Sequence, residues 1–402
     1  MVGPTMGPTA SDPQPPRHLA LRLGAYYAAV FLIVGIKSPF WPVWLAGRGL
    51  GAREIAALFA AAIWVNVATT PAIGALADRL GRRRAAMVVL CGIAIAGYAA
   101  FWNAYAFWTL LALTLVTATA QTALMPLGDS ITLAAVRERG IDYGRVRVWG
   151  SVSFIVAAMA SGAALSRATA GGRDNNTVLV LVLIASVVLF AACTGVPAAL
   201  GHATGPSRWS ALGTMARDRR FWRFIVVAAA LQASHQVYYG FGTLYWRSLG
   251  FSDAVIGVLW AEGVVAEIVL FWLGTRLLDR LGPLGLMIAG GAAGIVRWGL
   301  MGLVPGLGAA FALQLLHALT FGATHLGAMN HLSRTVPPDA AASAQALYAG
   351  ASSGIGSGLV MLGAGAAYAQ FGGRAYLFMA ALSALGLFGA LRLKRSAAQS
   401  AS

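Results

Sequence analysis

The 402-residue sequence has few charged residues. Asp, Glu, Lys and Arg make up only 10% of it, hydrophobic residues make up 58%, and the mean hydropathy is +0.72. A pair of water-soluble domains needs a far more polar surface than this composition supplies. We therefore expect an integral membrane protein in contact with a lipid bilayer.

Acidic residues are scarcer still, with 13 Asp and Glu against 29 Lys and Arg and a net charge of +16. Such an excess could indicate nucleic-acid binding, but the basic residues lie in the gaps between apolar runs and form no continuous face. We expect no nucleic-acid partner and interpret the basic residues as signals of membrane topology.

Other motifs are missing as well. Cys91 and Cys193 lie within apolar runs, which favours packing residues over a disulfide framework or a metal cluster. There is no G-x-x-x-x-G-K-[ST] loop and no Ser-His-Asp arrangement in a suitable context, so we expect neither ATP-driven transport nor an enzyme. The first 18 residues lack the apolar core and cleavage site of a signal peptide and predict a disordered cytoplasmic tail.

Apolar runs fill most of the chain. Each is long enough to cross a bilayer, which takes about 20 residues. We expect an all-α membrane protein with twelve such helices, at 19–46, 55–77, 85–103, 106–135, 144–166, 177–199, 222–247, 254–275, 284–304, 308–333, 341–369 and 373–393.

The longest hydrophilic gap, from Gly201 to Arg220, divides these runs six and six. The expected organisation is a tail, two pseudo-symmetric six-helix bundles joined by a cytoplasmic linker, and a second tail, at 1–18, 19–199, 200–221, 222–393 and 394–402. With a cytoplasmic N-terminus, 21 of the Lys and Arg fall on the cytoplasmic side and 6 outside. The positive-inside rule thus predicts both termini in the cytoplasm.

An internal repeat supports the division into halves. G-A-L-A-D-R-L-G-R-R-R follows the second run and G-T-R-L-L-D-R-L-G follows the eighth, and Asp78 and Asp279 are 201 residues apart. The first copy resembles the loop between helices two and three of the major facilitator superfamily. We expect it to act as a conformational latch through Gly74, Asp78, Arg79, Gly81 and Arg82.

The resemblance narrows to the branch of the superfamily with the bacterial phenylpropionate permeases and, more remotely, lactose permease. It covers nearly the whole chain, from Leu21 to Leu391. The segments that carry it are P-F-W-P-V-W-L, D-Y-G-R-V-R-V-W-G-S, L-Q-A-S-H-Q-V-Y-Y-G-F, G-V-V-A-E-I, V-R-W-G and L-Q-L-L-H, beginning at Pro39, Asp142, Leu231, Gly263, Val296 and Leu313.

An acid and a base flank the turn between the fourth and fifth runs. Asp129 lies nine residues before Glu138 and Arg147 nine after it, so a helical hairpin places the two at one depth, about 10 Å inside the turn. The resemblance implies that this pair holds substrate and that Phe154 stacks on it; a salt bridge that only pins the hairpin and a core role for Phe154 are the alternatives.

The second half supplies the expected proton site. The resemblance selects Glu267 in the eighth run, where burial favours a protonated carboxyl, and Arg297 needs a partner, Glu267 or His317. His317, Thr320 and Thr324, with His325 close by, form a polar stripe. The pattern departs from lactose permease here, because Thr320 stands where that family member has an acid.

The remaining candidates are His235 and Tyr238 on the seventh run and Lys37 on the first. His235 and Tyr238 can line one pocket. Lys37 could bind an anionic substrate or neutralise Glu262, and both interpretations stay open.

These features predict a monomeric, proton-coupled symporter that imports a small organic solute by alternating access, an aromatic carboxylate such as 3-phenylpropionate in the first place. It would use the proton gradient and no cofactor. A sugar or nucleoside symporter and a drug exporter are alternatives, and so is a membrane sensor that transports nothing.

Overall fold

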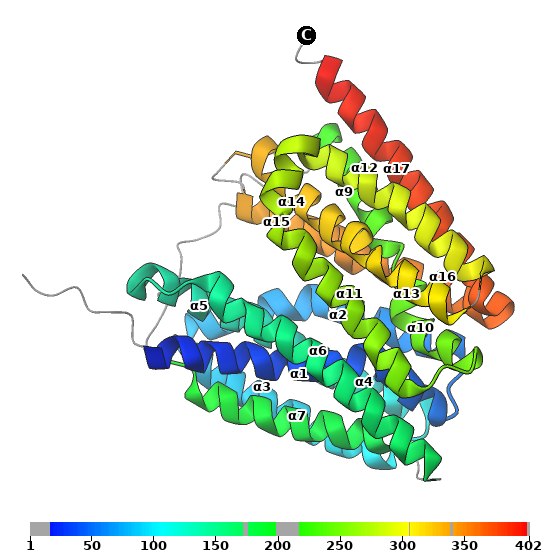
Figure 1. Ribbon diagram of the computed structural model, residues 1–402. Helices are drawn as coiled ribbons and strands as arrows, with labels where there is room; N and C mark the ends of the chain where they lie inside the picture. The colour runs from blue at the N-terminus through cyan, green and yellow to red at the C-terminus, as the bar shows by residue number, and fades with distance from the viewer. Residues whose placement is uncertain (1–16, 172–175, 198–216, 305, 338–340, 400–402) are drawn as a thin grey trace, which may run out of the picture.

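The computed structural model describes residues 17–171, 176–197, 217–304, 306–337 and 341–399. These residues fold into helices, and no strand occurs among them (Figure 1). The helices of the first half are α1 (Arg17–Gly47), α2 (Ala52–Arg79), α3 (Arg83–Ala100), α4 (Phe107–Thr122), α5 (Leu124–Arg139), α6 (Tyr143–Ala170) and α7 (Asn176–Gly195).

The second half begins with α9 and ends with the long helix α17, which extends beyond the others in Figure 1. Its helices are α9 (Arg219–Ala233), α10 (Gln236–Ser248), α11 (Asp253–Trp272), α12 (Gly274–Leu303), α13 (Leu307–Leu315), α14 (Thr324–Thr335), α15 (Ala341–Tyr348), α16 (Ser357–Phe371) and α17 (Tyr376–Gln399). Most of the expected tails and linker lies outside the described residues, although α17 continues to Gln399.

Ten helical stretches of the described chain are long and apolar enough to cross a membrane. One of them, Ala344–Ala397, is turned by a short 3-10 segment, Gly372–Ala375, and so comprises α16 and α17. The pair α9 and α10 adds another pass. This arrangement agrees with the twelve expected helices, and the chain is an all-α, multi-pass membrane protein.

Several passes are interrupted where the sequence disfavours a regular helix. The fourth pass breaks between α4 and α5 at Ala123, three residues before Pro126, and the seventh breaks at Ser234 and His235. The tenth and eleventh passes widen into π-helical turns at Ala318–Ala323 and Ala349–Gly356. Such turns are frequent at functional sites.

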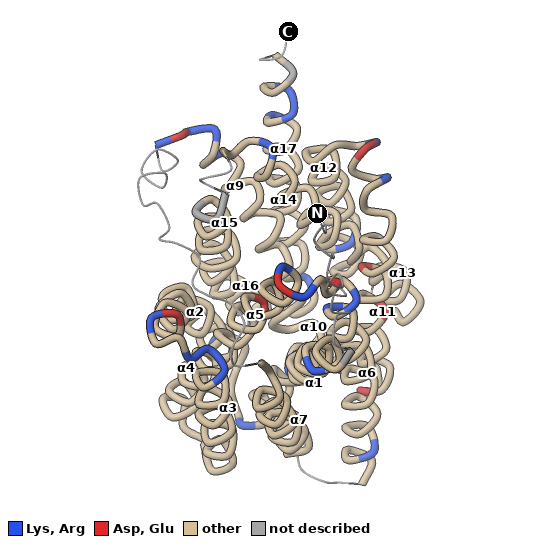
Figure 2. The backbone as a smooth tube through the Cα atoms, turned by 90° about the vertical axis from the view of Figure 1, so that its left-hand side faces the viewer, with Lys and Arg blue, Asp and Glu red and all other residues tan. Residues whose placement is uncertain are grey.

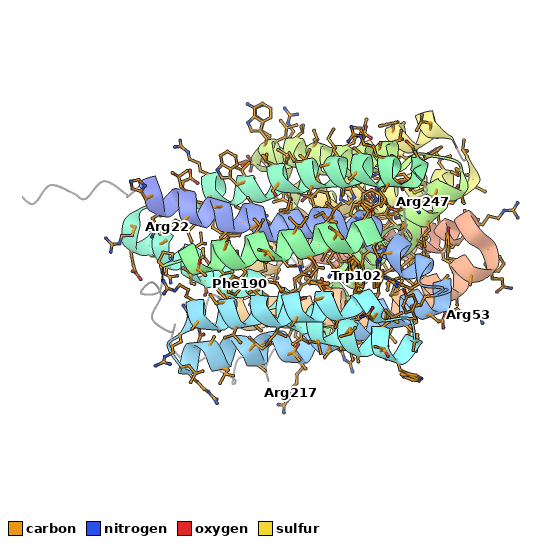
Figure 3. The ribbon with its side chains drawn as sticks, turned by 90° about the horizontal axis from the view of Figure 1, so that it is seen from below. Arg22, Arg53, Trp102, Phe190, Arg217 and Arg247 are labelled. Atoms are coloured by element: carbon orange, nitrogen blue, oxygen red, sulfur yellow. The ribbon has the colours of Figure 1, made fainter. Side chains whose placement is uncertain are left out.

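Charged residues gather at the ends of the helices. Figure 2, seen from the side at which α1 begins, shows basic positions on the turn after α2, the end of α5 and the start of α9. We call this side the termini side, because α1 begins there; α17 ends away from the far side, at the top of Figures 1 and 2. Arg22 lies toward it, and Arg53 and Arg247 lie at the far side (Figure 3).

The two halves touch closely toward the far side. A Cβ atom added at Gly162 of α6 would lie 2.3 Å from the carbonyl oxygen of Asp253, and one added at Gly257 of α11 would lie 2.3 Å from the carbonyl oxygen of Ala158. The Asp253 carboxylate is held by two hydrogen bonds from Arg247, of 2.6 and 2.7 Å. Backbone contact through glycine thus brings α6 and α11 together.

A second crossing joins α2 and α16. A Cβ atom on Gly365 would lie 2.2 Å from that of Ala56, and one on Gly358 would lie 2.1 Å from the indole of Trp64. Gly354 meets Val67 in the same way. Small residues of the eleventh pass therefore pack it against the other half of the molecule.

The repeated loop has related backbone features in both halves. Gly81 and Gly282 both have positive φ, at 60° and 66°, a conformation that glycine adopts without steric cost. In the first copy the Asp78 carboxylate pairs with Arg83 at 2.5 Å, so it anchors the first residue of α3. In the second copy Gly282 precedes Pro283 and makes a kink that separates the eighth and ninth passes.

Candidate functional site

Asp129 lies on α5 between two tyrosines. Its Oδ1 accepts a hydrogen bond of 2.5 Å from the hydroxyl of Tyr27 on α1 and one of 3.4 Å from Tyr143 on α6. Helix α5 approaches α1 closely here, because Gly128 faces the ring of Tyr26, whose hydroxyl donates to the carbonyl of Leu124 at 2.7 Å. The carboxylate is therefore satisfied by phenols of neighbouring helices.

Arg147 of α6 lies near the same tyrosine, Tyr27, but does not pair with Asp129. Its guanidinium carbon lies 4.2 Å from the ring centre of Phe31 and 5.4 Å from that of Tyr27. No carboxylate of the described residues lies within 4 Å of it. Asp129 and Arg147 therefore both contact Tyr27. The alternative interpretation, a salt bridge between them that only stabilises the hairpin, does not apply.

Phe154 and Phe31 occupy different environments near Arg147. Phe154 is 7% exposed and lies against α1, where a Cβ atom on Gly35 would be 3.0 Å from its Cα. The half-buried Phe31 carries the guanidinium on its ring. Phe31 was not expected as a site residue, because an aromatic residue in an apolar helix gives no signal of its own in the sequence.

Lys37 on α1 takes part in a cluster with Tyr98 of α3 and Gln121 of α4. Its Nζ donates to the Tyr98 hydroxyl at 2.6 Å and to the Gln121 Oε1 at 2.9 Å, and Tyr98 donates to that same oxygen at 2.7 Å. The indole of Trp41 lies 5.6 Å from Nζ. Among the described residues Lys37 forms no ion pair, so it does not neutralise Glu262.

In the second half Arg297 of α12 is fully buried at 0% exposure. Its Nη1 donates to Nδ1 of His317 at 3.0 Å and to the Thr320 hydroxyl at 2.9 Å, and its Nη2 donates to Oε1 of Gln314 at 2.5 Å. Of the two partners considered for Arg297, Glu267 and His317, the structure shows a hydrogen bond to His317. No carboxylate of the described chain lies within 4 Å of this guanidinium.

Gln314 connects that guanidinium to an aromatic wall. Its amide donates to the Tyr238 hydroxyl at 3.0 Å and to the Leu259 carbonyl at 2.8 Å. Tyr238 in turn stacks on Trp260, with ring centres 4.4 Å apart. Gln314 and Trp260 were missed from the sequence, although Gln314 stands inside the L-Q-L-L-H segment.

Glu267 of α11 meets the same cluster through His317. Its Oε2 lies 3.9 Å from Nε2 of His317. Because Nδ1 accepts from Arg297, we assign the ring proton of a neutral His317 to Nε2, which faces Glu267. A carboxyl, an imidazole and a guanidinium therefore lie in series, with a hydrogen bond between the last two.

The other histidines lie around this series. His235 is fully buried at 0% exposure, with Nδ1 3.1 Å from the Gln232 carbonyl and Nε2 3.2 Å from the Thr320 hydroxyl. The ring of Phe321 stacks on both His317 and His325. His235 and the buried Tyr238 therefore support the cluster from behind, whereas the half-buried Tyr239 stacks on His235 and Trp260.

Two further polar groups of the second half have unsatisfied atoms. Oε2 of Glu262 is buried and has no hydrogen-bond partner among the described residues, and the same holds for the Thr324 hydroxyl, which faces Gly290. The expected polar stripe is therefore divided: Thr320 joins the arginine cluster and Thr324 packs against α12.

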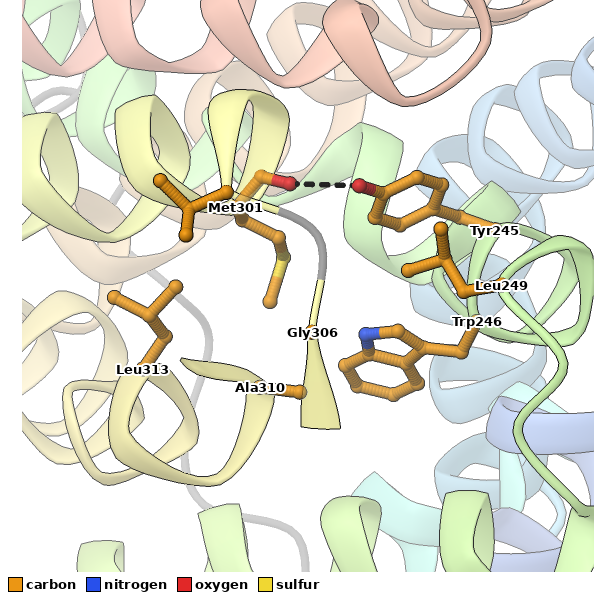
Figure 4. Close-up of a pocket in the computed structure, with 8 residues that line it drawn as sticks. Tyr245, Trp246, Leu249, Met301, Gly306, Ala310 and Leu313 are labelled. Atoms are coloured by element: carbon orange, nitrogen blue, oxygen red, sulfur yellow. Dashed lines mark hydrogen bonds between the residues drawn. The ribbon is translucent and has the colours of Figure 1, made fainter. Parts of the chain in front are cut away.

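The pocket in Figure 4 lies away from these charged groups. Its lining is apolar, and the Tyr245 hydroxyl donates to the Met301 carbonyl at 3.0 Å instead of pointing into it. We interpret it as a packing gap near the far side. In the described part of the chain no group of three or more His, Cys, Asp and Glu could hold a metal ion.

Comparison with known proteins gives consistent matches. The family model described as "MFS_1 like family" matches residues 20–380. The "Probable 3-phenylpropionic acid transporter" of Escherichia coli (strain K12) is 31% identical over 364 residues, 89% of this chain and 93% of that protein. The "Maltose permease" of Geobacillus stearothermophilus is 25% identical over 395 residues, 92% and 93% of the two chains.

Solved structures match in fold. The nucleoside transporter NupG superimposes with a TM-score of 0.81 at 16% identity, covering 93% of this chain and 98% of that one. A bacterial homologue of the lysosomal transporter Spinster gives 0.73 at 14% identity, covering 96% and 98%. The chain belongs to the MFS_1-like family of the major facilitator superfamily and is a secondary transporter, not an enzyme.

Proposed function

We propose that this transporter is a proton-coupled symporter that imports a small aromatic carboxylate such as 3-phenylpropionate by alternating access. The observation that carries the proposal is the series Glu267, His317 and Arg297, in which a carboxylate lies 3.9 Å from an imidazole that accepts from a buried guanidinium. In such a series, the binding of one proton to Glu267 can change the hydrogen bond between His317 and Arg297, and no other ion is needed.

The substrate class is supported by the relative named as a probable 3-phenylpropionic acid transporter and by the chemistry of the site. Arg147 and Lys37 are cations with no carboxylate partner within 4 Å among the described residues, and both have aromatic rings beside them. A cation next to aromatic faces suits a ligand with one anionic end and one flat apolar end.

Coupling follows from the contacts of His317. When Glu267 is ionised, it attracts the Nε2 proton of His317, which strengthens Nδ1 as the acceptor for Arg297. When Glu267 binds a proton, that attraction is lost and the contact with Arg297 weakens. Because Gln314 links Arg297 to Tyr238, the change reaches the aromatic wall of the site.

Alternating access would use the glycine crossings at the far side. They hold the halves together there in this conformation, and their separation would open the site to that side. We propose that the protein lies in a bacterial inner membrane with its termini side facing the cytoplasm, in accordance with the positive-inside rule. We also propose that a single chain carries out transport and that it needs no cofactor. The loop from Gly74 to Arg82 would then act as a latch between conformations.

The test separates exchange from accumulation. In proteoliposomes, Glu267→Gln is expected to retain counterflow of labelled 3-phenylpropionate without a pH gradient, because exchange needs no net proton movement. It is expected to lose accumulation driven by an imposed gradient. Full accumulation by this variant would refute Glu267 as the proton carrier.

A panel of ligands tests the substrate class itself. Purified protein is heated with 3-phenylpropionate, maltose and a nucleoside, and the midpoint of unfolding is compared, since a ligand that binds the folded state raises it. Stabilisation by the sugar or the nucleoside alone would favour the alternative symporter. Binding of the acid with no flux in proteoliposomes would favour a sensor.

A further inference from the structure

Lys37 is a charged side chain within the membrane span, and no anionic group of the described residues accompanies it. A primary ammonium has three N–H donors, and two of them go to Tyr98 and Gln121. The third donor has no acceptor among the described residues. Since a cation at membrane depth is costly, its retention in this place calls for a ligand or a partner.

The same three kinds of side chain meet at the equivalent place in the second half. Lys37 and Tyr238 are 201 residues apart, the separation of Asp78 and Asp279 in the repeated loop. Each triad joins the first, third and fourth passes of its half by hydrogen bonds through a glutamine. The two sets are Lys37, Tyr98 and Gln121, and Tyr238, Arg297 and Gln314.

The two triads differ in which pass carries the cation. In the second half it is the ninth pass, and the main neighbours of α12 all belong to its own half. In the first half it is the first pass, and α1 also contacts α10 and α11 of the other half. The exchange of tyrosine and cation therefore brings the positive charge of Lys37 to a helix that lines the boundary between the halves.

The cations also differ in how far they are satisfied. Arg297 is fully buried and donates to three side chains, whereas Lys37 is half-buried and keeps a donor free. The amide nitrogen of Gln121 likewise has no partner within the described ranges, because Lys37 and Tyr98 both use its oxygen. An ammonium and an amide nitrogen side by side can each donate to one carboxylate oxygen.

We propose that Lys37 and Gln121 form the carboxylate-binding site of the substrate. This inference rests on the proposed transport of an aromatic acid and assigns its anionic end to α1 and α4. Arg147 then contacts the substrate elsewhere: its guanidinium already lies on Phe31, and Asp129 binds the same Tyr27, so a carboxylate there would meet a second negative charge.

Matched neutral and anionic probes test the assignment. Binding of 3-phenylpropionate and of its amide, 3-phenylpropanamide, is measured for the wild type and for Lys37→Met, which keeps a long side chain without charge. We expect the variant to lose about tenfold to a hundredfold in affinity for the acid, as for a charge-assisted hydrogen bond, and to bind the amide as before. Lys394→Met, at an exposed position of α17, is the control and should bind both probes like the wild type.

A second variant avoids removing the side chain. Gln121→Glu has nearly the same shape and places a carboxylate beside Lys37 in the position of Oε1. It is expected to exclude the acid while amide binding persists, and amide binding also proves that the variant is folded. An unchanged ratio of acid to amide affinity in both variants would overturn the Lys37 site and leave the proposed transport intact. A wild type that binds neither probe would overturn both.

Discussion

A single methyl group at the crossing of α6 and α11 should change the conformational equilibrium of the transporter. In Gly257→Ala the new Cβ would lie 2.3 Å from the carbonyl oxygen of Ala158, a backbone atom that cannot turn away. Relief requires the two helices to separate, and overpacking of this kind costs about 1–3 kcal/mol. Because the cost applies only while the far side is closed, the closed state should lose about 5-fold to 150-fold in relative population.

Distances between spin labels measure this shift. Nitroxides on Arg167 of α6 and Ser248 of α10 report the separation of the halves at the far side, and the native Cys91 and Cys193 are buried. The longer distance should gain population in Gly257→Ala. Gly299→Ala is the matched control, since a Cβ there meets no atom within 4 Å. If both variants gave the wild-type distribution, close backbone contact would not be what holds the far side shut.

Two other substitutions address the polar contacts. Gln314→Leu removes the acceptor of an Arg297 hydrogen bond and the donors to Tyr238 and the Leu259 carbonyl. We expect it to destabilise the protein by about 3–5 kcal/mol and to lower its unfolding temperature in detergent. Gln232→Leu is the control and should leave the unfolding temperature unchanged, because the side-chain oxygen of Gln232 has no partner in the described structure. Asp129→Asn should weaken substrate binding about tenfold while substrate-driven proton uptake, followed with a pH dye, persists at saturating substrate; loss of proton uptake with unchanged affinity would assign Asp129 to the proton pathway instead.

The helices and the repeat could be predicted from the sequence, because twenty-residue apolar runs and the loop around Asp78 are local signals. The pairing of polar side chains was less accessible. Arg297 was expected to bind Glu267 or His317, and the structure selects His317, with Glu267 behind it. Asp129 and Arg147 both lie beside Tyr27, as a hairpin that aligns them allows, but Tyr27 and Phe31 come from α1, more than a hundred residues away.

The polar stripe of the tenth pass shows a different limit. The spacing of His317, Thr320 and Thr324 predicts one face only if the helix keeps 3.6 residues per turn. The π-helical turn at Ala318–Ala323 changes that period, so Thr320 faces the arginine and Thr324 faces Gly290. Intrinsic helix signals in the sequence do not reveal such a turn.

That π-helical turn also places one more residue in the tenth pass than a regular α-helix of the same length would hold. An extra residue rotates everything after it by about 100° about the helix axis, and removal of one residue would rotate α14 back. His325 would then leave the ring of Phe321 and a different edge of α14 would meet α12. The π-helical turn in the eleventh pass has the same property, so deletion of one residue from either turn would reset the rotation of the helix that follows it.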